Sequence, residues 1–475
     1  MTYGTMIHSS DKFSAVRDAT QAVQRPLREQ ASPAEVLLRI LELFDRNGIP
    51  YCVVGGAERL SAPGEWSGDL DCVVPPEIVP DRVAGLLHRH AAEIGADVVR
   101  WHLVVRGSNH YITLASLGDR ADPVFINLDL HSGYVKDAVP FLTAEELLRS
   151  RLLSDGVFVP APAQGFAHRL LKRVLGGSLP TTRGVGLSAL YAKDPAGCEH
   201  EVRRFCAPEH ADVIIAAASS GDWTLVISRL DEIGAMIRRR FVSRHPVKTA
   251  RGKLAAVRMF ARKRIAHPQG VELVLLGPDG VGKTTVIERI TPALIPVFDR
   301  VESPGPAPAV LPWSWRSRPI GRPHALPVRP AYQSIPKALF WLVYYRALHL
   351  RYVRGALKRG SLVLYHRSLL DALVDQRRYR YGGPIFLLRW VIRMLPRPDL
   401  VCVLDAPAEV VQQRKQEVPA AETARQRAAY RALAAALPNA LLVDASRPVE
   451  LVARDVTNAI LRRAAERSRQ ALEGS

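Results

Sequence analysis

Short apolar runs alternate with helix-like segments along the C-terminal half of the chain. Buried strands are predicted at residues 273–276 (LVLL), 361–365 (SLVLY) and 398–405 (PDLVCVLD). A long helix is predicted at 336–358, and we expect its aromatic side chains to lie in the core. The segment from QRAAYRALAAAL onward predicts a helix, a strand and a closing helix. Such alternation predicts a mostly parallel sheet with helices on both faces.

The N-terminal half has a different pattern, in which strands and helices are less regularly mixed. The sequence S-x-x-E at residues 32–35 predicts a capped helix start, and the helix should end near Gly48. Strands are predicted at 50–54 and 124–130. Helical periodicity returns at 143–152, 165–174, 200–206 and 225–237. This pattern predicts an α/β domain followed by a helical subdomain.

A length of 475 residues is enough for two or three domains with sizeable cores. We predict the following division: a polar, loosely held segment at 1–31, an α/β domain at 32–141, a helical subdomain at 142–235, a basic linker at 236–270 and a second α/β domain at 271–475. Residues 302–336 are rich in proline and include Trp313 and Trp315, so we expect a loop or lid there.

Composition and charge narrow the location and the partners. The five cysteines are scattered without metal-ligand spacing, no apolar run approaches ~18 residues, and the N-terminus lacks the apolar core of a signal peptide. We therefore expect a cytoplasmic protein without a transmembrane span. The net charge of +19 implies anionic partners, although no recognisable nucleic-acid-binding motif accompanies it.

The basic linker allows two interpretations. Its arginines and lysines are interleaved with Met259 and Phe260, a pattern that suits a helix lying on an anionic membrane. The same pattern suits a helix between domains with its arginines in solvent, and we favour this second interpretation.

One glycine-rich loop follows the strand at 273–276. Gly277, Gly282, Lys283 and Thr284 have the G-x-x-x-x-G-K-[ST] spacing of a phosphate-binding loop, GPDGVGKTT. Glycines let the backbone N–H groups surround a polyphosphate, and the helix that follows presents its positive end to it. Lys283 would reach the β- and γ-phosphates, and Thr284 would hold Mg²⁺. We predict the nucleotide site at Gly277, Asp279, Gly280, Gly282, Lys283, Thr284 and Thr285.

Three aspartates in the N-terminal half form a second candidate site. Asp69 and Asp71 stand twelve residues or more after Gly55-Gly56, and alternate residues of a strand share a face. Asp129, on the strand at 124–130, is a third candidate ligand. Carboxylates so placed suit Mg²⁺, which prefers oxygen ligands. The simpler alternative is a strand end with solvated aspartates. Lys172, on a helix further along, is expected to be solvated rather than to face a site.

This arrangement resembles the nucleotidyltransferase superfamily over about residues 33–131. The resemblance rests on a GG turn, a D-x-D pair on the next strand and a later acid. It implies that the GG turn packs against nucleotide phosphates and that the acids hold metals for in-line nucleotidyl transfer. Folds of this kind also occur as inactive, substrate-binding relics, so both outcomes remain open.

The C-terminal half resembles thymidylate kinase-like proteins over about residues 271–465. The phosphate loop is similar to the family form G-x-D-G-x-G-K-T-T, and PDLVCVLD is similar to its P-D-L-x-x-x-L-D segment. The resemblance implies that Asp279 lies near the sugar of the acceptor nucleotide, and that Asp405 faces the nucleotide or makes structural hydrogen bonds. It also implies an arginine-containing lid, for which Arg414, Lys415 and Arg427 are candidates.

The sequence departs from the family at His366-Arg367. The family has Asp-Arg at this strand end, with the acid near the metal and the arginine on phosphate, so Arg367 remains a candidate phosphate clamp. A histidine cannot supply the charge of a carboxylate, although it can hydrogen-bond phosphate. Asp371 or Asp375 could supply the missing carboxylate, and Arg377, Arg378 and Arg380 offer more phosphate contacts. The run resembles a subgroup associated with bacterial surface polysaccharides.

These observations predict an ATP-dependent phosphotransferase that uses Mg²⁺, with Lys283, Arg367 and Arg414 as its catalytic residues. The simplest acceptor is dTMP or another nucleoside monophosphate. A coupled variant would combine kinase and nucleotidyl transfer in one chain.

Two alternatives remain open. One is a kinase that acts on a sugar or glycan phosphate, and the other is a non-catalytic ATP-binding regulator. The resemblance also leaves a homodimer open, and peripheral membrane contact is compatible with the basic charge.

Overall fold

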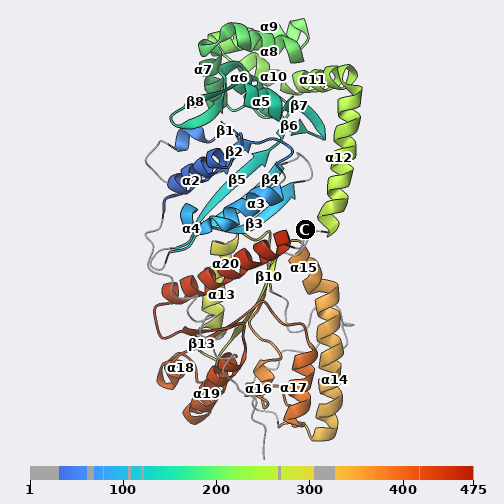
Figure 1. Cartoon of the computed structure of the whole chain (residues 1–475). Coiled ribbons are helices and arrows are strands. Elements are labelled where there is room, and N and C mark those ends of the chain that lie inside the picture. Colours follow the sequence, from blue (N-terminus) through green and yellow to red (C-terminus); the bar gives the residue numbers. More distant parts are fainter. Residues whose placement is uncertain are drawn as a thin grey trace, which may run out of the picture. The chain divides into compact units, whose positions relative to one another are not determined.

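The computed structural model describes residues 31–60, 69–78, 80–104, 109–118, 122–265, 269–303, 327–416 and 418–473 (Figure 1). The predicted N-terminal segment up to residue 30, most of the proline-rich segment with Trp313 and Trp315, and the side chains around Met259 and Phe260 lie outside these described residues. The chain forms two compact units, which we call the N-terminal unit (31–116, 124–267 and 468–475) and the C-terminal unit (117–123 and 268–467).

The N-terminal unit is built on a mixed five-stranded sheet with the order β1-β2-β5-β4-β3. Strands β2 and β5 are parallel, and the other neighbouring pairs are antiparallel. The sheet strands are β1 (Cys52–Gly55), β2 (Asp69–Val73), β3 (Asp97–Val104), β4 (Asn109–Ser116) and β5 (Val124–His131). Two hairpins follow, formed by β6 (Gly133–Lys136) with β7 (Val139–Thr143), and β8 (Arg151–Ser154) with β9 (Val157–Pro160).

The helices of this unit divide into two groups. Those near the sheet are α2 (Pro33–Arg46), α3 (Pro80–Arg89), α4 (Ala91–Ile94) and α5 (Ala144–Arg149), with a 3₁₀ turn at Ala57–Arg59. The helical part comprises α6 (Pro162–Val174), α7 (Thr181–Lys193), α8 (Pro195–Phe205), α9 (Pro208–Ser220), α10 (Thr224–Ser228), α11 (Leu230–Arg244) and α12 (Pro246–Ile265). The predicted helix over 143–152 is therefore too long, because β8 begins at Arg151.

Helix α2 shows how local sequence sets the fold. Ser32 accepts a hydrogen bond from the Glu35 backbone N–H, Glu35 accepts one from the Ser32 backbone N–H, and Pro33 occupies the first turn, as the sequence predicted. The buried face of α2 then packs with that of α3 and with alternate residues of β2 and β5, including Leu70, Leu128 and Leu130. The intervening residues of both strands therefore face the opposite side of the sheet.

The C-terminal unit has a parallel five-stranded sheet with the order β11-β12-β10-β13-β14. The strands are β10 (Val271–Leu276), β11 (Val301–Glu302), β12 (Leu362–Tyr365), β13 (Leu400–Asp405) and β14 (Ala440–Asp444). Every residue of β10 is buried, so both faces of the sheet are covered at its centre. After β10 the chain forms β11 and β12 on one side of β10, and it then forms β13 and β14 on the other side. The carboxyl end of β10 is thus at a switch point, where parallel sheets bind ligands.

The helices of this unit connect the strands. They are α13 (Lys283–Leu294), α14 (Ala331–Leu348), a π-helical turn (His349–Val353), α15 (Arg354–Lys358), α16 (Asp371–Val374), α17 (Ile385–Met394), α18 (Ala408–Arg414), α19 (Ala420–Ala436) and α20 (Val449–Glu473). The predicted helix over 336–358 begins earlier than expected, with Pro336 inside α14. Its aromatic residues are only partly in the core, because Tyr344 is buried whereas Phe340 is exposed. No described helix is long and apolar enough to cross a membrane.

Candidate functional sites

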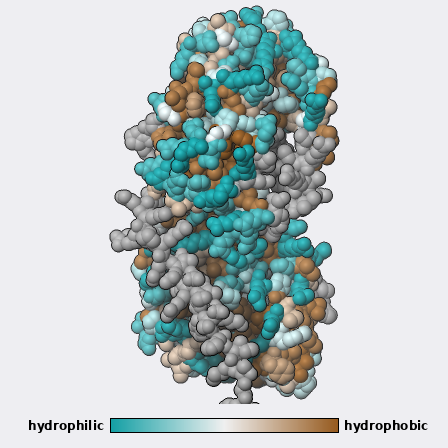
Figure 2. Space-filling model, viewed as in Figure 1, coloured by the Kyte–Doolittle hydropathy of each residue, from teal (hydrophilic) through white to brown (hydrophobic). Residues whose placement is uncertain are grey.

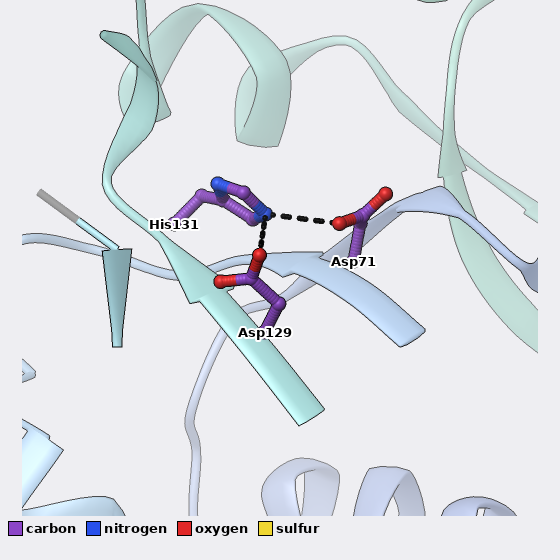
Figure 3. A group of neighbouring side chains, drawn as sticks. All are labelled: Asp71, Asp129 and His131. Carbon is purple, nitrogen blue, oxygen red and sulfur yellow. Dashed lines mark hydrogen bonds and ion pairs between the residues drawn. The ribbon is translucent and has the colours of Figure 1, made fainter. Parts of the chain in front are cut away.

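Acidic side chains meet on the face of the N-terminal sheet that is opposite α2. The register of β2 and β5 places Asp69 beside Asn127 and Asp71 beside Asp129. Because this pair is parallel and in register, Asp71 and Asp129 project side by side. Together with His131 they form a group whose ligand atoms all lie within 4.8 Å of one another (Figure 3). Asp69 lines the same cavity but is outside this group.

His131 is the residue that sequence reasoning missed. Its Nε2 atom lies 3.2 Å from Asp71 Oδ1 and 3.3 Å from Asp129 Oδ2 (Figure 3). Burial opposes the charged imidazolium, but the hydrogen bonds and charges of the two aspartates raise the pKa of His131 to about 9. It stands two residues after Asp129 on β5, so the same alternation that selected the aspartates could have found it.

Helix α6 supplies two more groups to this site. Lys172 Nζ lies 3.0 Å from Asp71 Oδ2, so the expectation of a solvated lysine was wrong. His168, one turn earlier on the same face, is buried, and burial lowers its pKa to about 3. Burial by itself would raise the pKa of Asp71, but the His131 hydrogen bond and the Lys172 charge hold that pKa well below its usual range. Burial raises the pKa of Asp69.

The Gly55-Gly56 turn closes against the same aspartates. A Cβ atom on Gly55 would lie 2.4 Å from Asp71 Oδ2, and one on Gly56 would lie 3.0 Å from the Asp69 carbonyl oxygen. Gly56 also has a φ of +87°, which favours glycine. The turn, the aspartates and α6 line a cavity of about 420 Å³, together with Arg59, Arg169, Arg173 and Arg183. The cavity therefore offers carboxylates on one wall and arginines on others.

In the C-terminal unit, the phosphate loop connects β10 to the start of α13. The loop follows β10 and ends where α13 begins, and Gly277, Gly280 and Gly282 all have positive φ values, of 142°, 90° and 105°. Lys283 Nζ donates hydrogen bonds to the carbonyl oxygens of Gly277 (2.6 Å) and Pro278 (2.9 Å). Burial lowers the pKa of Lys283. Thr284 and Thr285 are exposed at the first turn of α13.

Two arginines converge on the acid of the loop. Arg367 Nη2 donates to Asp279 Oδ1 at 2.7 Å, and Arg378 pairs with Asp279 Oδ2. Lys283 Nζ is 3.7 Å from Asp279 Oδ1. Arg367 follows β12, so it reaches the loop from the strand beside β10. The loop acid therefore holds three cationic side chains at the carboxyl end of the sheet.

The carboxylates that the sequence offered in place of an acid at position 366 are engaged elsewhere. Asp371 is buried and accepts hydrogen bonds from the Ser368 N–H (2.9 Å) and the Tyr430 hydroxyl (2.7 Å). Asp375 is also buried and accepts from the Arg378 backbone N–H and from Gln426. Burial, with the charges of Arg367 and Lys283, lowers the pKa of His366, which favours its neutral form.

The lid candidates lie at two places. Arg414 Nη1 donates to the carbonyl oxygens of Val281 (3.3 Å) and Ala445 (3.1 Å), which places it against the phosphate loop. Arg427 makes two hydrogen bonds, of 2.7 and 3.1 Å, to the carboxylate of Asp405 at the end of β13. Arg431 adds a third contact to that carboxylate at 2.9 Å. Arg414 thus contacts the loop, whereas Arg427 holds Asp405.

No family model matches the chain, and no curated protein matches it. Among solved structures, a thymidylate kinase from Candida albicans is similar at 17% identity and a TM-score of 0.30, covering 40% of this chain and 90% of that one. A thymidylate kinase from Ehrlichia chaffeensis is similar at 15% identity and a TM-score of 0.29, covering 40% and 98%. Likeness at this level does not indicate a function.

Proposed function

We propose that the C-terminal unit transfers the γ-phosphoryl group of ATP to a phosphorylated small molecule, most simply a nucleoside monophosphate such as dTMP. The observation that carries the proposal is the convergence of Lys283, Arg367 and Arg378 on the phosphate loop at the carboxyl end of β10. Phosphoryl transfer needs positioning and charge neutralisation more than covalent chemistry from the protein. A loop surrounded by cationic side chains provides both.

Each part of the loop has a role in this reaction. The backbone N–H groups of the loop and the start of α13 bind the phosphates, and Lys283 exchanges its two carbonyl contacts for phosphate oxygens. Arg414 already contacts the loop and would neutralise charge that develops on the transferred group. Arg367 and Arg378, held by Asp279, would bind the donor and acceptor phosphates in line.

The residues present fit Mg²⁺ bound as the ATP complex. Thr284 exposes its hydroxyl at the start of α13, whereas Asp371, Asp375 and Asp405 are committed to hydrogen bonds or ion pairs. Mg²⁺ commonly keeps several waters and takes other ligands from the nucleotide phosphates. Thr284 would therefore be its main protein ligand, and the ion would neutralise the charge of the β- and γ-phosphates.

The acceptor is the open part of this proposal. His366, neutral beside Arg367, can hydrogen-bond a phosphate or a hydroxyl group without adding charge. Its presence in place of an acid favours a second candidate acceptor, a sugar or glycan phosphate. A non-catalytic ATP-binding regulator would keep the same loop and bind ATP without turnover.

The experiment measures ADP release from Mg·ATP by the full chain, first with dTMP and then with other nucleoside and sugar monophosphates. Lys283→Ala is the test variant, and Lys358→Ala, an exposed lysine on α15, is the matched control. Acceptor-dependent release that is lost only in Lys283→Ala supports the proposal. ATP binding without turnover on any acceptor contradicts it and favours the regulator.

A second function is proposed for the N-terminal unit, namely metal-dependent nucleotidyl transfer. The observation that favours it is a buried oxygen atom, Asp129 Oδ1, which has no hydrogen-bond partner among the described residues. Asp129 lines the same cavity as Asp69 and Asp71. Such an oxygen fits a divalent ion, which Asp71, Asp129 and, after losing its proton, His131 would hold with Asp69 nearby. The ion would polarise a nucleotide phosphate, and the Gly55-Gly56 turn would approach that phosphate.

This second proposal is tested by pyrophosphate release from nucleoside triphosphates with Mg²⁺ or Mn²⁺. Release that is lost in Asp71→Asn but kept in Lys283→Ala would assign the activity to the N-terminal cavity. Binding of a nucleotide without release would instead indicate a substrate-binding relic.

A further inference from the structure

Helix α14 exposes an apolar stripe, interrupted by Arg346, on the side opposite its packed face. Its buried residues include Ala338, Tyr344 and Leu348. A second set of large apolar residues recurs at helical spacing on the other side and is exposed by 39–73%: Tyr332, Ile335, Leu339, Val343 and, one turn beyond the helix, Leu350. A helix that is apolar on both sides while only one side is packed leaves a surface available to a partner.

Helix α17 extends this surface. It packs beside α14, and the Arg346 guanidinium of α14 donates hydrogen bonds to the Met394 carbonyl oxygen at the end of α17. On its outer side, Phe386 is 71% exposed and Trp390 is 46% exposed. Figure 2 shows apolar surface in the region of these two helices. We call the outward sides of α14 and α17 together the α14–α17 face.

The charged residues of the two helices that form this face have a single sign. Helices α14 and α17 contain Lys337, Arg346, Arg389 and Arg393, and neither helix contains an acid. Arg389 and Arg393 alternate with Phe386 and Trp390 on the exposed side of α17. Neither arginine forms an ion pair with any residue that the structure describes. Aromatic and aliphatic side chains are thus interleaved with exposed arginines.

We propose that the α14–α17 face binds the surface of an anionic lipid bilayer. Exposed Trp, Phe and aliphatic side chains insert at the level of the headgroups, while the neighbouring arginines bind lipid phosphates. A second copy of the chain explains the pattern less well, because a symmetric contact would bring Arg389 and Arg393 toward arginines of the same face. Nucleic acid would match the charge but would leave the aliphatic stripe of α14 exposed.

The proposal does not depend on the phosphotransferase activity. The face belongs to helices that connect strands of the C-terminal unit and contains none of the phosphate-loop residues. If both proposals hold, membrane binding would place the phosphotransferase reaction at the bilayer. The enzyme would then meet acceptors that are membrane-bound or are released at the membrane.

The experiment is co-sedimentation of the full chain with phosphatidylcholine vesicles that contain or lack phosphatidylglycerol. We expect binding only with phosphatidylglycerol, and loss of that binding at high salt. The variant Phe386→Ser/Trp390→Ser removes the apolar anchors, and Leu153→Ser, a residue 67% exposed on the β8–β9 hairpin, is its control. Arg389→Glu/Arg393→Glu reverses two charges, and Lys193→Glu/Lys248→Glu is the matched reversal on exposed lysines of the N-terminal unit.

Both face variants should reduce vesicle partitioning by on the order of tenfold or more, while their controls stay within about twofold. Absence of binding to phosphatidylglycerol vesicles would overturn the proposal, and so would equal losses in variant and control. A stable dimer that Phe386→Ser/Trp390→Ser converts to monomer, without vesicle binding, would assign the face to a second copy. Salt-sensitive binding to duplex DNA alone would assign it to nucleic acid.

Discussion

The two candidate sites group their charges in different ways. In the N-terminal cavity, Asp71 and Asp129 lie together on one wall and pair with His131 and Lys172, while arginines line other walls. At the phosphate loop, by contrast, Lys283, Arg367 and Arg378 gather around Asp279. Clustered carboxylates attract a metal ion, whereas clustered cations attract a polyphosphate. In both sites these described side chains are paired with groups of opposite charge.

The two sites also differ in how their charges are positioned. The N-terminal carboxylates are short side chains fixed by strand register, with Asp71 opposite Asp129. The cations of the C-terminal site are long side chains that reach the loop from the segment after β12 and from α13. A site built on strands is rigid and depends on exact spacing, whereas a site built from long cations can adjust to its ligand.

The largest expected effect is on phosphoryl transfer. Arg367→Ala removes a guanidinium that contacts the phosphate loop through Asp279. We expect kcat to fall by about 10²–10³-fold, because one hydrogen-bond donor aimed at the charge that develops in the transition state typically contributes that much. Arg354→Ala, an exposed arginine on α15, is the control. The measurement is steady-state ADP release. A change confined to KM would contradict a role in the transition state and leave Arg367 as a binding residue.

The next effect concerns metal binding in the N-terminal cavity. Asp129→Asn replaces one carboxylate oxygen with an NH₂ group and removes the negative charge. We expect the affinity for Mn²⁺ to fall by at least about tenfold, because even the loss of a residue that hydrogen-bonds to a metal ligand typically lowers metal affinity by that factor. Asp155→Asn, in an exposed turn with a φ of 50° that asparagine tolerates, is the matched control. Calorimetric titration of Mn²⁺ measures both. Equal affinities in the two variants would show that the carboxylate group holds no metal.

Much of the local structure was predictable from the sequence because it depends on local rules. The capping box at Ser32, the strand before Gly277 and the helix that starts at Lys283 all follow from short-range hydrogen bonding and backbone freedom. The helix predicted over 143–152 extended two residues into β8, because a short apolar stretch such as residues 151–154 has no decisive periodicity.

The partners within each site were harder to predict, because they come from segments distant in sequence. Lys172 reaches Asp71 across 101 residues, and Arg378 reaches Asp279 across 99. Periodicity shows which side of a helix is polar, but it does not show which strand that side will face. The exposed stripe of α14 was missed for a related reason. Apolar periodicity predicts that a helix side is buried, but it does not show whether another element of the same chain covers that side.

A smaller effect tests the rigidity of the strand-built site. In Gly55→Ala the new Cβ would lie 2.4 Å from Asp71 Oδ2, so either the turn or the carboxylate must move. We expect a loss of about 2–3 kcal/mol in the free energy of unfolding, typical of overpacking. Gly85→Ala, in α3 with its nearest contact at 3.6 Å, should instead gain about 0.5–1 kcal/mol from helix propensity. Urea unfolding measures both, and a neutral Gly55→Ala would show that Asp71 is free to move.

The smallest expected effect is a pH-dependent change in stability at β10, the strand that precedes the phosphate loop. Glu272 on β10 is buried, and burial, together with the nearby charge of Asp399, raises its pKa from 4.5 to about 7. Because the folded state binds this proton more tightly than the unfolded chain, Glu272 destabilises the fold progressively as the pH rises from about 4.5 to 7. Glu272→Gln removes the charge, so it should stabilise the C-terminal unit by about 1–2 kcal/mol at pH 8 and by little at pH 4.5. Thermal unfolding at the two pH values measures the difference, with the exposed Glu450→Gln as a control that should show no such dependence. A stabilisation that is equal at both pH values would mean that folding leaves the pKa of Glu272 unchanged, which would contradict the effect of burial on this residue.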